Sequence, residues 1–205
     1  NVSKYLKIDG VLDLVGESQL LQPNNSIVDY TGSGRLERDQ EGTSNLYNYN
    51  YWGSPVSTLG ASNSRTYAIG SILYDGNNPV SWTTGYDANG ATNPVTLSSN
   101  WLYNFLNGAI NDYSSWISIN PTSNVNVGLG FTLKGSGAAT PDQTYTFRGQ
   151  PNNGTITHSI SGSNLALIGN PYPSAIDANT FIDDNGPLGS STLLDGALIF
   201  WEQAL

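Results

Sequence analysis

The stretch from Tyr47 to Val56 reads Tyr-Asn-Tyr-Asn-Tyr-Trp-Gly-Ser-Pro-Val and predicts an extended strand. Successive side chains on a strand point to opposite faces, so Tyr47, Tyr49 and Tyr51 share one face and Trp52 lies on the other. The chain of 205 residues contains 12 Tyr and 5 Trp but no Met. Large rings bury much area per residue where strands are short, so this composition favours an all-β fold.

Residues 1–46 precede this stretch and contain short strand patterns separated by tight polar turns. Apolar and polar residues alternate with a period of two in Val11-Leu-Asp-Leu14 and in Arg35-Leu-Glu-Arg38. Such strands suit either a meander or the rungs of a parallel β-solenoid, in which each rung buries its apolar face against the next. We favour the solenoid, and expect residues 1–46 to form a short solenoid-like region packed on a β-sandwich or jelly-roll-like domain.

The predicted β-sandwich-like domain spans residues 47–205. Residues 65–74 predict one long strand, and the alternation in 128–134 and 144–148 predicts an antiparallel pair. Residues 174–182 predict a helical turn with Ser174 as its N-cap. The chain stops within an apolar run, so we expect the C-terminal end of this domain to be truncated.

Composition limits the partners of this chain. Seven basic and 16 acidic residues give a net charge of −9, and only 11% of the residues are charged. Phosphate-rich partners need clusters of Lys and Arg, so we expect no nucleic-acid partner. No apolar stretch reaches the roughly 20 residues needed to cross a bilayer, so we expect no membrane span. The lack of cysteine excludes disulfides and thiolate chemistry, a profile common among extracellular bacterial proteins.

A second signature, from Leu167 to Asp177, reads Leu-Ile-Gly-Asn-Pro-Tyr-Pro-Ser-Ala-Ile-Asp. With this signature, the stretch 47–56 and shorter matching pieces, the chain resembles a module of large secreted cell-surface proteins of Bacteroidota that use the type IX secretion system. The shorter pieces are residues 16–22, 36–42, 130–135, 146–154 and 199–202. The resemblance implies an extracellular or cell-surface location, contact with the secretion machinery during export, and adhesion, surface display or polysaccharide handling. It implies no catalytic motif.

Exposed aromatic rings form the first candidate site. The apolar faces of sugar rings can stack on indole and phenol rings, while neighbouring amides such as those of Asn48 and Asn50 bind hydroxyl groups. The same rings also suit a buried core, because aromatic area dominates core energetics, and spacing alone does not separate the two interpretations. The candidate ligand-binding residues are Tyr49, Tyr51, Trp52, Trp82 and Trp101, and Tyr103 is a further aromatic residue considered with them.

Calcium is the one cofactor for which the sequence offers candidate ligands. Hard cations prefer clustered carboxylate and amide oxygens on tight loops, and Asp183, Asp184 and Asn185 form such a cluster. Two adjacent carboxylates repel each other unless something neutralises them. Asp and Asn before glycine are also ordinary turn residues, and the closing glutamate of an EF-hand is missing.

Enzyme chemistry is not expected from this sequence. A glycosidase needs two carboxyl groups facing each other across a cleft, and nothing pairs Glu37, Asp39, Glu41 or Glu202 in that way. The single histidine, His158, lies in an alternating Thr/Ser stretch, where a surface histidine is commoner than a catalytic one.

The sequence therefore predicts a structural or adhesive segment of a large secreted bacterial surface protein. Its expected partner is a surface polysaccharide or another surface protein. The first alternative is a carbohydrate-binding module, assisted by calcium. A polysaccharide hydrolase is the weaker alternative.

Overall fold

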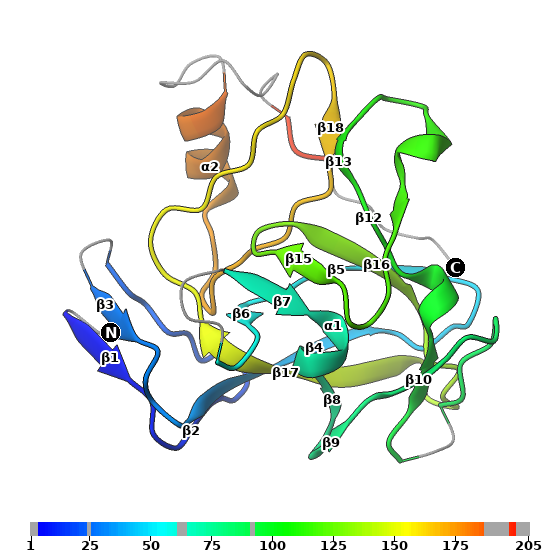
Figure 1. Cartoon of the computed structure of the whole chain (residues 1–205), viewed down its shortest axis with the longest axis horizontal. Coiled ribbons are helices and arrows are strands. Elements are labelled where there is room, and N and C mark those ends of the chain that lie inside the picture. The colour runs from blue at the N-terminus through cyan, green and yellow to red at the C-terminus, as the bar shows by residue number, and fades with distance from the viewer. Residues whose placement is uncertain (1–3, 24–25, 61–64, 91–92, 187–196, 200–205) are drawn as a thin grey trace. The chain divides into compact units, whose positions relative to one another are not determined.

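A computed structural model describes residues 4–23, 26–60, 65–90, 93–186 and 197–199 (Figure 1). Most of the regular structure in these residues is β-strand, which confirms the predicted all-β fold. The chain divides into two compact units, Asn1–Ser174 and Ala175–Leu205. All of the strands described below belong to the first unit.

The N-terminal strands pair in parallel, in the same order along the chain. β1 (Tyr5–Lys7) pairs with β3 (Ile27–Asp29), and β2 (Val11–Leu14) pairs with β4 (Arg35–Thr43). Figure 1 draws β1, β2 and β3 in blue. β1 and β2 thus form one rung of a coil, and their parallel partners β3 and β4 form the next rung. This arrangement agrees with the predicted solenoid-like region.

The central pair of the larger sheet is β4 with β17 (Asp142–Pro151), antiparallel from Thr43 opposite Asp142 to Leu36 opposite Gly149. The strand order is β2-β4-β17-β8-β9, with β8 at Leu73–Asp75 and β9 at Asn78–Pro79. β6 (Val56–Ser57) pairs with the end of β17. Strands from both sides of the predicted division at residues 46 and 47 therefore belong to one sheet and one unit.

The second sheet is antiparallel and contains the signature strand. Its order is β14 (Ile117–Ser118), β12 (Tyr103–Asn104), β16 (Gly130–Lys134) and β5 (Tyr49–Gly53). Trp52 lies opposite Phe131 in this sheet. The predicted strand at residues 47–56 thus forms, although its regular part is shorter.

The two sheets meet through aromatic side chains. Trp52 on β5 contacts Tyr145 and Phe147 on β17, with ring centroids 5.7 and 5.9 Å apart. Trp52 is 6% exposed, and both partner rings are fully buried. Aromatic pairs in edge-on or tilted arrangements stabilise a core beyond the area that they bury. Two sheets joined in this way form the layers of a sandwich.

Shorter elements surround the two sheets. They are β7 (Thr66–Ala68), β10 (Ser81–Thr83), β11 (Thr96–Ser98), β13 (Leu106–Gly108), β15 (Asn124–Asn126), β18 (Leu165–Ala166), helix α1 (Ile69–Ile72) and the 3-10 turns η1 (Ser99–Trp101) and η2 (Tyr113–Ser115). The strands among them pair as β7 with β15, β10 with β11, and β13 with β18.

The long strand predicted for residues 65–74 is interrupted by α1. Ile69 and Ile72 are both fully buried, and residues three apart share one face of a helical turn. The backbone N–H of Gly70 donates to the carbonyl of Pro121 at 2.8 Å. Tertiary burial of two isoleucines on the same side therefore overrides the strand pattern here.

Helix α2 (Ala178–Asn185) is the regular element described in the second unit. Its N-cap is Asp177, whose Oδ1 accepts a 2.7 Å hydrogen bond from the backbone N–H of Thr180. The predicted helix at 174–182 with Ser174 as N-cap was therefore wrong in its start. A carboxylate accepts this bond with its full charge close to the positive helix end, which favours Asp177 as the cap.

The two signatures meet at a backbone contact within the first unit. A Cβ atom on Gly53, at the end of β5, would lie 2.6 Å from the Cα of Gly169 in the second signature. Nearby, the Asn152 side chain donates to the carbonyl of Pro171 at 2.9 Å, and it accepts from the hydroxyl of Ser57. The glycines are required because no side chain fits between the two backbones.

Asp29 links the two N-terminal rungs. Its carboxylate accepts hydrogen bonds from the hydroxyl of Tyr5 on β1 and from the N–H and hydroxyl of Thr31. These bonds, led by the Thr31 hydroxyl, lower the pKa of Asp29 from 3.8 to about 2. The charged form is therefore stabilised in the folded protein.

Gly53→Ala is expected to destabilise the protein by about 1–3 kcal/mol, because the methyl group overlaps backbone that has no room to move. Chemical denaturation measures the loss. Gly10→Ala is the matched control, since a Cβ there meets nothing within 4 Å and should change the free energy of unfolding little. Equal stability of the two variants would contradict the close contact.

Asp29→Asn is expected to lower stability at neutral pH and to have no effect in strong acid. The folded pKa is depressed, so the contribution of Asp29 is present above its unfolded pKa and disappears as the pH falls from about 4 to about 2. Denaturant midpoints of both proteins, measured between pH 7 and pH 2, should converge over that interval. A constant gap would mean that the carboxylate charge plays no part.

Candidate ligand-binding face

The outer surface of the β14-β12-β16-β5 sheet is rich in aromatic rings. Because Trp52 points into the core, its neighbours Tyr49 and Tyr51 point outward. Tyr51 and Tyr103 both lie opposite Thr132, which places them on the same surface. We call this surface the aromatic face and define it as Tyr49, Tyr51, Trp101, Tyr103 and Trp116 together with Lys134.

Ring contacts connect four members of the aromatic face in two pairs. Tyr49 meets Trp101 edge-on with centroids 6.1 Å apart, and Tyr51 meets Trp116 with centroids 6.4 Å apart. Phe105 supports Trp116 from the core side at 4.9 Å. All five rings of the face are partly exposed.

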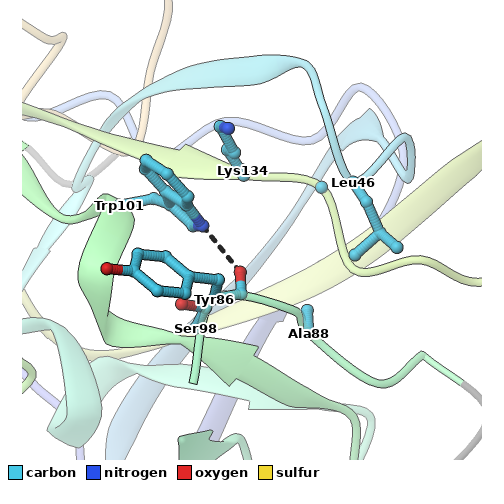
Figure 2. Close-up of a pocket in the computed structure, with 7 residues that line it drawn as sticks. Leu46, Tyr86, Ala88, Ser98, Trp101 and Lys134 are labelled. Atoms are coloured by element: carbon cyan, nitrogen blue, oxygen red, sulfur yellow. Dashed lines mark hydrogen bonds between the residues drawn. The ribbon is translucent and has the colours of Figure 1, made fainter. Parts of the chain in front are cut away.

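Trp101 is fixed by hydrogen bonds at both its backbone and its ring. Its carbonyl accepts from the hydroxyl of buried Thr132 at 2.9 Å, and its indole N–H donates to the carbonyl of Tyr86 at 2.8 Å. Figure 2 shows this second bond, with the ring of Tyr86 below the indole and Lys134 above it. A shallow recess here is lined by Leu46, Tyr86, Ala88, Ser98, Trp101, Lys134 and Gly135.

Lys134 places a positive charge on the aromatic face. It lies opposite Tyr49 in the sheet, and its Nζ is 3.6 Å from the centroid of Trp101 and 5.2 Å from that of Tyr49. A cation over the face of an indole is attracted by the electrons of the ring. This contact holds the ammonium close to the rings.

The hydroxyls of Tyr49 and Tyr51 stay protonated at neutral pH. Burial raises the pKa of Tyr49 and of Tyr51, and the neighbouring Tyr103 and Tyr51 raise that of Tyr49 further. A neutral phenol both donates and accepts a hydrogen bond. The face therefore combines flat apolar rings with hydroxyl groups and one cation.

Three of the five predicted ligand-binding residues come together here, namely Tyr49, Tyr51 and Trp101. Trp52 was wrongly predicted as a binding residue, because its ring is buried between the sheets. Trp82 on β10 packs against the core and lies beside Gly70. Trp82 is partly buried. Among the described residues, its ring makes no contact with the rings of the aromatic face.

Sequence reasoning missed Trp116 and Lys134. The strand predicted at 128–134 ends at Lys134. Its alternation buries Phe131 and Leu133 and places Lys134 on the outer side. The sequence pattern could therefore have identified Lys134. Trp116 follows η2, and nothing in the local sequence relates it to Tyr51.

Residues 2–205 of the chain match one family model. The chain belongs to the DUF8693 family, described as a domain of unknown function. No curated protein and no solved structure matches it in these comparisons. None of the helices described in this DUF8693 domain is long and apolar enough to span a membrane.

The predicted calcium ligands of the DUF8693 domain lie on a helix and not on a loop. Asp183, Asp184 and Asn185 form the last turn of α2, where successive side chains point about 100° apart. The Asn185 amide donates to the carbonyl of Phe181 at 2.8 Å. No group of three or more His, Asp or Glu side chains that could hold a metal occurs among the described residues. The loop required by that prediction is therefore absent at these three positions.

The carboxylates considered for glycoside hydrolysis share one face of β4. Glu37 Oε1 lies 2.5 Å from Nε of Arg35 and 3.1 Å from Nε of Arg148, although the second N–H is not aligned for a hydrogen bond. Asp39 accepts from the hydroxyl of Thr146 at 2.6 Å. Carboxylates on one strand face point the same way, whereas hydrolysis needs two that face each other.

His158 has a partner that favours a structural role. Its Nε2 lies 2.8 Å from the carbonyl of Val127. A carbonyl only accepts hydrogen bonds, so this nitrogen carries a proton and cannot act as a base. Glu202, the fourth carboxylate considered, lies outside the described residues.

Trp52→Ala is expected to cost about 3–5 kcal/mol of stability, because it opens a cavity between the two sheets. Trp101→Ala should cost less, since its ring is already partly exposed and its loss encloses no void. Unfolding in denaturant, followed by tyrosine and tryptophan fluorescence, compares the two variants. A larger loss for Trp101→Ala would reverse the assignment of core and surface.

Proposed function

We propose that this DUF8693 chain is an adhesive module of a secreted bacterial surface protein, and that it binds carbohydrate through the aromatic face. The observation that carries the proposal is the set of supported, partly exposed rings at Tyr49, Tyr51, Trp101 and Trp116 on one sheet surface. Flat rings beside hydroxyl groups match the alternating apolar and polar surfaces of a sugar.

The extracellular part of the proposal is supported by composition and by the resemblance to cargo of the type IX secretion system. The chain has no cysteine, and only 11% of its residues are charged. Such a protein would meet the secretion machinery during export and a surface polysaccharide, or another surface protein, afterwards.

A second candidate function is purely structural, as a spacer within the parent protein. The contact between Gly53 and Gly169 favours it, because both signatures then serve the packing of the domain. The two candidates differ in one respect: a spacer needs no ligand for the aromatic face.

Trp101→Ala is expected to weaken polysaccharide binding at least about tenfold, since an interface tryptophan commonly contributes that much. The intact chain and the variant are titrated against a panel of neutral and anionic polysaccharides, with calcium and then with EDTA. Calorimetry reports the affinity, and the thermal midpoint should rise with any ligand that binds only the folded state.

Tyr5→Ala is the matched control, because Tyr5 is an exposed aromatic residue on a different sheet. It should bind like the unmodified chain. Equal binding by Trp101→Ala would exclude the aromatic face, and a panel without any binding would leave the structural candidate. Loss of binding in EDTA would support the calcium-assisted alternative.

A further inference from the structure

We propose that the aromatic face selects saccharides that carry an anionic group, above all the carboxylate of a uronic acid, and that Lys134 recognises that group. This inference deepens the carbohydrate binding proposed above and rests on it. It assigns the ligand class from the one cation of the face and from the position in which that cation is held.

Lys134 is held beside two rings of the candidate site. It is the last residue of β16, it lies opposite Tyr49, and its Nζ is 3.6 Å from the centroid of Trp101. Trp101 is itself fixed by Thr132 and by the carbonyl of Tyr86. The ammonium therefore has a defined position beside the rings.

Lys134 has no carboxylate partner within the described part of the chain. The ion pairs found there join Lys7 to Asp9, and Arg35 and Arg148 to Glu37. This is notable in a protein with 16 acidic and only 7 basic residues. An ammonium that contacts only aromatic rings keeps its capacity for charge-assisted hydrogen bonds to a ligand.

The cation over Trp101 disfavours a neutral sugar at this position. A neutral ring that stacks on the same face of the indole has to displace Lys134 and break the cation–π contact. A sugar carboxylate can instead approach the ammonium from the solvent side, while its ring packs on neighbouring tyrosines. The anionic sugar keeps the existing contact and adds an ion pair.

The net charge of the chain restricts this attraction to direct contact. At −9, the protein as a whole repels a polyanion. At physiological ionic strength, however, exposed charges are screened beyond about 8 Å. The selectivity should therefore come from pairing with Lys134 and not from long-range steering.

The test compares two polymers with the same sugar backbone, polygalacturonate and its fully methyl-esterified, neutral form. Calorimetric titration of the intact chain should show tighter binding to polygalacturonate. Lys134→Gln should weaken that binding at least about tenfold, the range for a hydrogen bond to a charged group. Binding to the ester should not weaken, because a neutral ring no longer has to displace the ammonium, so the preference for the charged polymer is lost. Lys134→Arg should retain the preference, because it keeps the charge.

Lys7→Gln is the matched control, since it removes a lysine from β1, in a different sheet, and should bind like the unmodified chain. Near-ultraviolet circular dichroism checks that each variant is folded. The comparison of the two polymers on the unmodified chain needs no variant, so it tests the inference even if Lys134→Gln fails to fold. Dextran sulfate against dextran then distinguishes a sulfate ester from a carboxylate as the anionic group.

The outcomes separate this inference from the function on which it rests. Equal binding of charged and neutral polymers, both lost in Trp101→Ala, would keep carbohydrate binding and overturn the selectivity. A preference for the anion that survives Lys134→Gln would overturn the role of Lys134. A chain that binds none of the four polymers would overturn the inference, and the wider panel would then decide on carbohydrate binding itself.

Discussion

The contact of Trp52 with Tyr145 and Phe147 joins the two sheets, and the aromatic face depends on it. Side chains alternate along β5, so a strand that buries Trp52 must present Tyr49 and Tyr51 on its other side. A shift of one residue would exchange the two sets and expose the tryptophan to water. The same register places Lys134 opposite Tyr49. One buried ring therefore determines which groups the protein presents on the aromatic face.

Backbone contacts complete this arrangement. Gly53 ends the strand that carries the aromatic face, and it meets Gly169 with no room for a side chain. Asn152 and Pro171 add a buried hydrogen bond at the same junction. The two signatures, far apart in the sequence, are thus parts of one packing contact. Together they hold β5 in place, and the aromatic face on its outer side gains rigidity from that contact.

The sequence predicted the strands better than it predicted their surroundings. The alternation at 47–56 and the aromatic composition were sufficient for an all-β fold, and the short patterns before residue 46 indicated the parallel rungs. The helical turn at Ile69 and Ile72 was missed because burial of both side chains on one side outweighs the local strand pattern. Asp183 and Asp184 were expected on a loop, yet Asp177 caps a helix that includes them. In each case a contact outside the local pattern decided the outcome.

For the candidate site, the sequence by itself determined that Tyr49 and Tyr51 share one side of a strand and Trp52 the other. This follows from the period of two, which is a property of the backbone. Only the tertiary structure decided which side is buried, because burial depends on β17, about one hundred residues further along the chain. It also brought Trp101, Trp116 and Lys134 to the same surface. Such distant neighbours leave no local signal, since their proximity arises from sheet pairing and packing and not from spacing along the chain.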